Sequence, residues 1–422
     1  MSSDAPTAVV PSRDPEYRGV YFLFVFAFMS KLWAGPVAQQ YKIHYISYFL
    51  FAIPVIALTI KKRLRSDGAL YSERSLLLFF LYLTVSISWA YSPSTTAQWI
   101  AVDSLYLLVF WLAYVLFINL TEDRLARVFE LIPFGVACVS IWALIVFGEV
   151  RVSEGEDFSQ LGATSTILSF YLTAALPFLV RDLYLEKKLI AKLALLATIP
   201  LTFLLQSRAA LGANLFVVVL TAIDFATFNR RRLLQTAAIL GTVVVVVGIV
   251  FSTVDFEEDS LGGRLQHATT FSFMDAEEEF QHPEMKGEDL ERRMMWFVAY
   301  QGFVEHPIEG IGYGGINSRF DDTFGYEVPS HGFVTTLLAE TGLLGTVLFL
   351  FVMTGYFVRL GRGLKQSSTY EQRTFLKASR ASMIGMLFVG LFHQVYQDQI
   401  FFILLAWGYA SPERNRRSIP AR

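Results

Sequence analysis

Runs of apolar residues alternate with short polar connections along most of the chain. A transmembrane helix needs about 20 consecutive residues that are mostly apolar. The pattern predicts twelve such helices, over residues 17–35, 41–60, 75–91, 97–118, 125–148, 161–180, 189–206, 208–226, 233–252, 331–358, 378–395 and 397–410. We therefore expect an all-α polytopic membrane protein.

Composition agrees with this interpretation. Of the 422 residues, 54% are hydrophobic and 17% are charged, whereas a typical soluble protein has about 25% charged residues. The formal net charge of −2 gives no reason to expect a nucleic acid as partner. Because Cys138 is the one cysteine of the chain, an intrachain disulfide and a cysteine-based metal cluster are both excluded. It lies in an apolar run.

The positions of the basic residues predict the orientation of the helices, because Lys and Arg are retained on the cytoplasmic side of a membrane. If the N-terminus is cytoplasmic, all but nine of the 35 Lys and Arg residues lie in or beside cytoplasmic segments. The nine are Lys31, Lys42, Arg151, Arg208, Arg264, Lys286, Arg292, Arg293 and Arg319. We therefore expect both termini to be cytoplasmic.

This topology divides the chain into three parts. Residues 1–252 contain helices one to nine, residues 253–330 form one large extracytoplasmic loop, and residues 331–422 contain the last three helices and a cytoplasmic tail. The first part of the loop has acidic runs that are typical of a solvated segment. Its second part has Trp296, Ala299, Tyr300 and Phe303 at helical spacing, which predicts an amphipathic helix at the membrane surface.

A glycine-dense turn follows that helix, between His306 and Gly315. It follows no predicted strand and has no lysine of the kind that binds nucleotide phosphates, so we interpret it as a tight backbone turn. The segment Pro329-Ser330-His331-Gly332 then opens the tenth predicted helix, with Gly342 and Gly345 further along.

These motifs together resemble the O-antigen ligase and O-antigen polymerase superfamily of bacterial membrane glycosyltransferases. The resemblance rests on Arg292-x-x-x-Trp296, on His306-Pro307-Ile308-x-Gly310-x-Gly312, and on His331 followed by Gly342 and Gly345. It implies a membrane fold of the GT-C-like kind in the bacterial inner membrane, with the active site on the periplasmic face. It also implies transfer of a glycan from an undecaprenyl diphosphate carrier to an acceptor glycolipid, the lipid A-core, in lipopolysaccharide or surface polysaccharide biosynthesis.

The chemistry of this transfer needs a base for the acceptor hydroxyl and cations for the departing diphosphate. His331 is the candidate base, because a neutral imidazole accepts a proton near pH 7. Arg208 and Arg292 are the candidate diphosphate ligands, since guanidinium has a planar fork of donors that matches phosphate oxygens. The sequence has no cluster of ligands at metal spacing, so we expect no structural zinc and no cofactor, while a divalent ion at Asp321-Asp322 stays open.

Other interpretations remain open from the sequence. In the ligase branch the residue after the histidine is usually Asn, Ser or Gln, and here it is Gly332, so a polymerase of the same superfamily is the main alternative. Twelve helices with both termini inside also describe many secondary transporters, and an inactive envelope scaffold is a third possibility. Lys31, Asp103 and His393 either line the same outer cavity or pack within the bundle.

Overall fold

The described part of the chain is entirely helical. The computed structural model describes residues 15–33, 43–60, 74–147, 165–185, 189–204, 208–226, 288–325, 332–391 and 398–417. These residues form thirteen α-helices, one 3-10 helix and no strand. The α-helices are α1 (Pro15–Trp33), α3 (Ile43–Ile60), α4 (Arg74–Val85), α5 (Pro93–Asn119), α6 (Glu122–Phe147), α7 (Ser165–Tyr184), α8 (Leu189–Leu204), α9 (Arg208–Ala226), α13 (Glu288–Glu305), α14 (Gly315–Phe324), α15 (Phe333–Gln366), α16 (Tyr370–Gly390) and α17 (Gln399–Arg417).

The predicted membrane helices correspond closely to observed ones. Each predicted span coincides with one of the helices α1 to α9 or α15 to α17, except the ninth, 233–252, which lies outside the described residues. Three helical segments are long and apolar enough to cross a membrane, namely Pro93–Asn119, Glu122–Trp142 and Phe333–Gln366. The all-helical architecture is confirmed, while the full number of twelve crossings stays a prediction.

The distribution of side chains is that of a membrane protein. Large apolar side chains project outward from the helices, such as Phe22 (69% exposed), Ile53 (64%) and Phe351 (60%). Arg181 is instead fully buried, where its guanidinium donates to Asp182 at 2.6 Å. A bilayer accommodates exposed apolar side chains, whereas charged groups within it must face the interior and find partners.

Aromatic packing holds the centre of the bundle together. The indole ring of Trp407 on α17 is completely buried and packs against aromatic rings from α5, α6, α7 and α16. Those rings are Phe117, Phe129, Phe178 and Phe375, with centroids 5.2 to 6.1 Å from that of Trp407. Large rings at such distances contribute favourable ring–ring contacts in addition to buried area.

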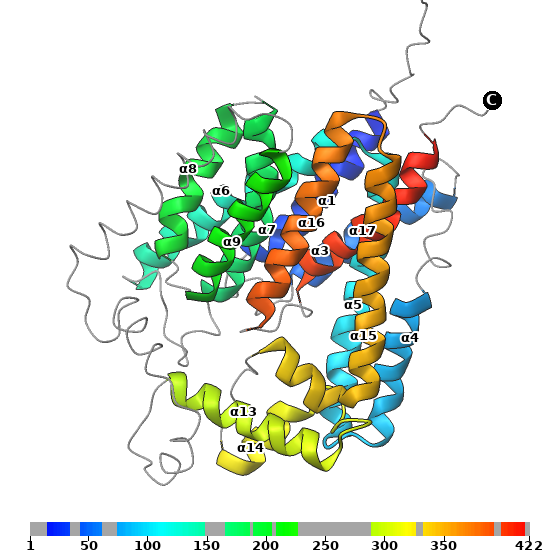
Figure 1. The fold of residues 1–422 in the computed structure, drawn as a ribbon, viewed down its shortest axis with the longest axis vertical. Helices are drawn as coiled ribbons and strands as arrows, with labels where there is room; N and C mark the ends of the chain where they lie inside the picture. The colour runs from blue at the N-terminus through cyan, green and yellow to red at the C-terminus, as the bar shows by residue number, and fades with distance from the viewer. Residues whose placement is uncertain are drawn as a thin grey trace, which may run out of the picture.

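Helix α15 is broken near its N-terminal end. Gly342 has φ +61° and ψ −167°, so the helical hydrogen-bond ladder is interrupted there. Figure 1 shows that a short first part of α15 runs in a different direction from the long second part. Residues 343–366 alone are about 36 Å long at 1.5 Å per residue, which is enough to cross a bilayer.

The turn between α13 and α14 supplies the hydrogen bonds that the break removes. The Ile311 and Gly312 amides donate to the carbonyls of Ala339 and Glu340, at 2.9 and 3.0 Å. In the opposite direction, the amides of Leu343 and Leu344 donate to the carbonyls of Pro307 and Ile308, at 2.9 and 3.1 Å. Both sides of the break are thereby satisfied, which matters because unpaired buried backbone groups are costly.

Glycine is required where the turn and the break meet. A Cβ atom on Gly310 would lie 2.4 Å from the Glu340 carbonyl oxygen, and one on Gly342 would lie 2.2 Å from that of Ile308. Tyr82 of α4 closes the junction, because its hydroxyl proton is shared between the carbonyls of Glu309 and Thr341, at 2.8 and 2.7 Å. The interpretation of this glycine-dense segment as a tight backbone turn agrees with this geometry.

Helix α13 is amphipathic, but its buried face differs from the predicted one. Met295, Val298 and Ala299 are buried against α14 and α15, whereas Tyr300 is 66% exposed. The prediction that Tyr300 shares a face with Ala299 is therefore wrong, because the helix turns a different side toward α15. An outward stripe of Phe297, Tyr300 and Val304 remains apolar.

Replacing Gly342 tests the junction. We expect Gly342→Ala to lower the melting temperature in detergent, because alanine both clashes with the Ile308 carbonyl and adopts a left-handed conformation at a cost of about 1–3 kcal/mol. Gly361→Ala in the same helix is the matched control, since a Cβ there meets nothing within 4 Å. Equal melting temperatures for the two variants would contradict the requirement for glycine at position 342.

Candidate functional site

The structure describes the three predicted site residues to different extents. Arg208 is the first residue of α9, and Arg292 lies in the second turn of α13. For both, the position in the helix is described and the side chain is not. His331 lies outside the described residues, although Gly332, which follows it in the chain, is described.

The segments that carry these residues are linked through Gly332 and the end of α16. A Cβ atom on Gly332 would lie 3.4 Å from Nε1 of Trp296, one turn after Arg292, and 3.4 Å from the Leu391 carbonyl oxygen. Leu391 directly follows α16, and Phe388 of that helix stacks on Phe216 of α9, with centroids 5.4 Å apart. Phe388 also lies 3.7 Å from a Cβ built on Gly212, one turn after Arg208.

The backbone conformation at position 332 explains why glycine follows His331 in this chain. Its φ of +92° lies in the region that favours glycine, and a Cβ there would come within 2.9 Å of the Thr335 hydroxyl. That hydroxyl donates to the Gly332 carbonyl at 3.0 Å, at the start of α15. Asn, Ser or Gln at this position would be strained here.

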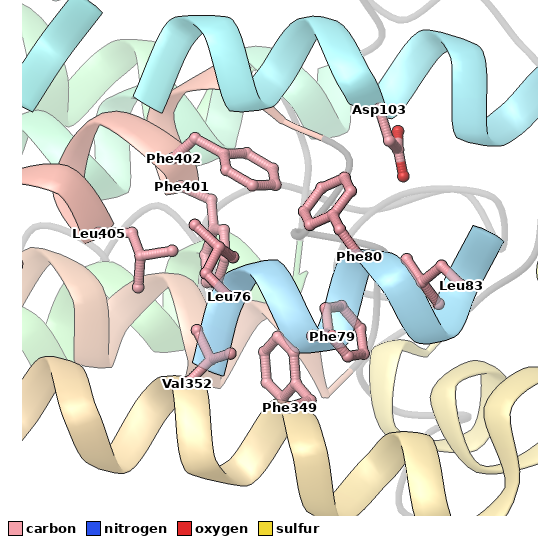
Figure 2. A pocket seen from close by; sticks show the side chains of 10 residues that line it. All are labelled: Leu76, Phe79, Phe80, Leu83, Asp103, Phe349, Val352, Phe401, Phe402 and Leu405. Atoms are coloured by element: carbon pink, nitrogen blue, oxygen red, sulfur yellow. The ribbon is translucent and has the colours of Figure 1, made fainter. Parts of the chain in front are cut away.

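A buried carboxylate connects the turn to the bundle. Asp103 of α5 is 2% exposed, and its Oδ2 accepts a hydrogen bond from the Tyr313 hydroxyl. Figure 2 shows Asp103 at the edge of a narrow apolar crevice that also contains Phe80, Leu83 and Phe349. Of the two alternatives for Asp103, this contact supports an anchoring role within the bundle.

The connector between α4 and α5 joins the same assembly. The Tyr91 amide donates to the Ile311 carbonyl at 2.7 Å, and a Cβ on Gly312 would lie 2.4 Å from the Cβ of Ala90. Figure 1 shows α13 and α14 beside the ends of α4, α5 and α15, at one end of the molecule. The connector and the 288–325 segment therefore share one face, as the predicted topology requires.

Ion pairs organise the surface of this face. Arg319 of α14 donates two hydrogen bonds to Glu305 at the end of α13, at 2.6 and 2.7 Å. These bonds lower the pKa of the Glu305 carboxyl and raise that of Arg319. Nearby, His306 Nδ1 lies 3.0 Å from Glu309, and this hydrogen bond lowers the pKa of the Glu309 carboxyl.

Sequence reasoning did not identify several residues that this face depends on. Tyr82 and Tyr313 lie in segments that read as ordinary apolar helix or turn, Gly342 was identified as a motif residue but not as a helix break, and α14 was not predicted as a helix. The available signals were Gly342 itself and the glycine spacing at Gly310, Gly312 and Gly314, which all have positive φ. Among the described residues, no group of three or more His, Cys, Asp or Glu side chains is arranged to bind a metal ion.

Comparison with known proteins supports the resemblance. A search of curated proteins gave no significant match. The family model described as O-antigen ligase matches residues 193–350, a range that includes most of α8, all of α9, α13 and α14, and the broken part of α15. The resemblance to the O-antigen ligase family is thereby confirmed over residues 193–350 of this membrane protein.

Proposed function

We propose that the protein is a glycosyltransferase that moves a glycan from undecaprenyl diphosphate to an acceptor sugar of the lipid A-core. The observation that carries this proposal is the linkage of α9, α13, α16 and Gly332 described above. Positions 208, 292 and 332 are far apart in sequence, yet each belongs to one of these linked segments. The family match, which covers positions 208, 292 and 332, supports the reaction class.

The proposed reaction is a displacement at the anomeric carbon. His331 takes the proton of the acceptor hydroxyl, whose oxygen forms the new bond to that carbon. The bond from the carbon to the carrier oxygen breaks, and the diphosphate departs with the electron pair. Arg208 and Arg292 stabilise the negative charge that develops on it, because guanidinium stays positively charged at physiological pH.

The proposed location is the periplasmic face of the bacterial inner membrane, with both termini in the cytoplasm. The distribution of Lys and Arg supports this orientation. The outward apolar stripe of α13 supports a position of that helix at the membrane surface, where Phe297, Tyr300 and Val304 would contact lipid. A diphosphate headgroup lies at the same depth.

A polymerase of the same superfamily is the alternative, and Gly332 is the feature that favours it. Deleting the gene and analysing the envelope glycan separates the two. Loss of a ligase leaves long carrier-linked polymer, because chains are still built and are not transferred. Loss of a polymerase leaves products with a single repeat. A wild-type glycan profile in the deletion strain would contradict both assignments.

Replacing His331 tests the base. We expect His331→Ala to reduce glycan transfer about 100- to 10,000-fold, the usual contribution of general acid–base catalysis. Transfer is measured with the purified protein in detergent, using carrier-linked glycan and glycolipid extracted from the deletion strain. His282→Ala, another histidine of the predicted loop, is the control and keeps its activity. A loss below about tenfold, with normal membrane insertion, would refute the role.

Conservative replacement tests the diphosphate ligands. We expect Arg208→Lys and Arg292→Lys each to lower transfer by about 10- to 100-fold, because lysine keeps the charge and loses a charge-assisted hydrogen bond worth about 1.5–3 kcal/mol. Arg362→Lys, at an exposed position of α15, provides the control. Native transfer rates in both test variants would rule out a two-arginine clamp.

A further inference from the structure

An open pocket of about 380 Å³ lies on the face that carries α13 and α14. It is formed by the α4–α5 connector, the end of α13, the following turn and α14. The residues that line it are Trp89, Tyr91, Glu305, His306, Ile311, Arg319 and Thr323. Its volume falls in the range of about 300–1,000 Å³ that is usual for small-molecule sites.

Two aromatic side chains provide flat apolar surface in this pocket. Tyr91 is 46% exposed, and its ring is oriented by a hydrogen bond of 2.8 Å from its hydroxyl to Asp322. The ring of Trp89 packs against Tyr82 with centroids 5.8 Å apart, so it is held by the same residue that closes the α15 junction. Aromatic faces carry negative potential and attract the weakly positive C–H groups of a sugar ring.

The polar groups of the pocket suit hydroxyl groups rather than anions. The charge of Arg319 is matched by the two hydrogen bonds to Glu305, and His306 is bonded to Glu309. Asp322 adds another carboxylate beside Tyr91. Carboxylates accept hydrogen bonds from hydroxyls and repel phosphates, while the remaining guanidinium N–H groups donate.

We propose that this pocket is a carbohydrate subsite that holds a neutral pyranose unit. The assignment rests on the proposed glycosyltransferase function and adds a binding position to it. Glu305 lies nine residues after Trp296 on α13, which corresponds to about 13.5 Å along the helix. The pocket therefore binds a unit distant from the reacting sugar, and this remote binding positions the substrate for transfer.

Binding to immobilised oligosaccharides tests the subsite directly. The purified full-length protein in detergent is applied to an array of neutral hexose oligosaccharides and their sialylated or phosphorylated counterparts. We expect retention on the neutral glycans and about a tenfold loss of retention for Tyr91→Ala. Trp89→Ala should lose retention to about the same extent as Tyr91→Ala. Tyr300→Ala, which removes an exposed aromatic ring of α13 outside the pocket, should retain glycans like the native protein.

Three results would overturn the subsite: no retention by the native protein, a preference for acidic glycans, or unchanged retention by Tyr91→Ala. Tyr91→Ala leaves the backbone bond to Ile311 in place, so it remains informative if Trp89→Ala does not fold. Tyr91→Phe keeps the ring and is expected to preserve most of the retention.

Transfer kinetics then identify which substrate supplies the sugar. If Tyr91→Ala raises the KM for the glycolipid about tenfold with kcat unchanged, the subsite binds a sugar of the acceptor. If the KM for the carrier-linked glycan rises instead, the subsite binds a sugar of the donor. Unchanged KM values for both would refute the subsite. If the native protein retains neutral glycans but transfers none, the proposed reaction fails and the subsite stands.

Discussion

The described structure depends most on the exchange of four backbone hydrogen bonds between the break in α15 and the turn after α13. The break leaves carbonyls before Gly342 and amides after it without helical partners, and residues 307–312 pair with all four. This pairing sets the direction of the first part of α15, and so the position of Gly332. It also fixes the end of α13 and, through Tyr82 and Tyr91, the ends of α4 and α5. A local backbone irregularity thus assembles one whole face.

The sequence was sufficient for the apolar helices of the bundle, because apolar runs of about 20 residues have few alternatives in a bilayer. It was insufficient for the break at Gly342, since an isolated glycine in an apolar run is common in membrane helices that stay continuous. The buried face of α13 was also not predictable. Trp296, Ala299, Tyr300 and Phe303 fit one stripe by spacing, and only packing against α15 turns Tyr300 outward.

The candidate site shows the same division. Motif similarity selected His331 and Arg292, and the chemistry of guanidinium added Arg208, but spacing alone gives no reason for α9 and α13 to be linked through the end of α16 and Gly332. That link comes from tertiary contacts, of Phe388 with Phe216 and of Gly332 with Trp296. The hydrogen bond between Asp103 and Tyr313 joins two residues that are 210 positions apart, so no local sequence pattern predicts it. The sequence identified reactive residue types, and packing determines which of them meet.

The break in α15 also makes the shape of one helix depend on a separate segment of the chain. Residues 307–312 hydrogen-bond to the backbone groups of α15 that the interruption at Gly342 leaves without helical partners. Until that turn docks, an unbroken α15 satisfies its own backbone and is the stable form in lipid. The bent form of α15 is therefore conditional on the turn, because the bend leaves backbone groups that only a docked partner satisfies. A substitution that undocks residues 307–312 would act on the direction of a helix that those residues do not belong to.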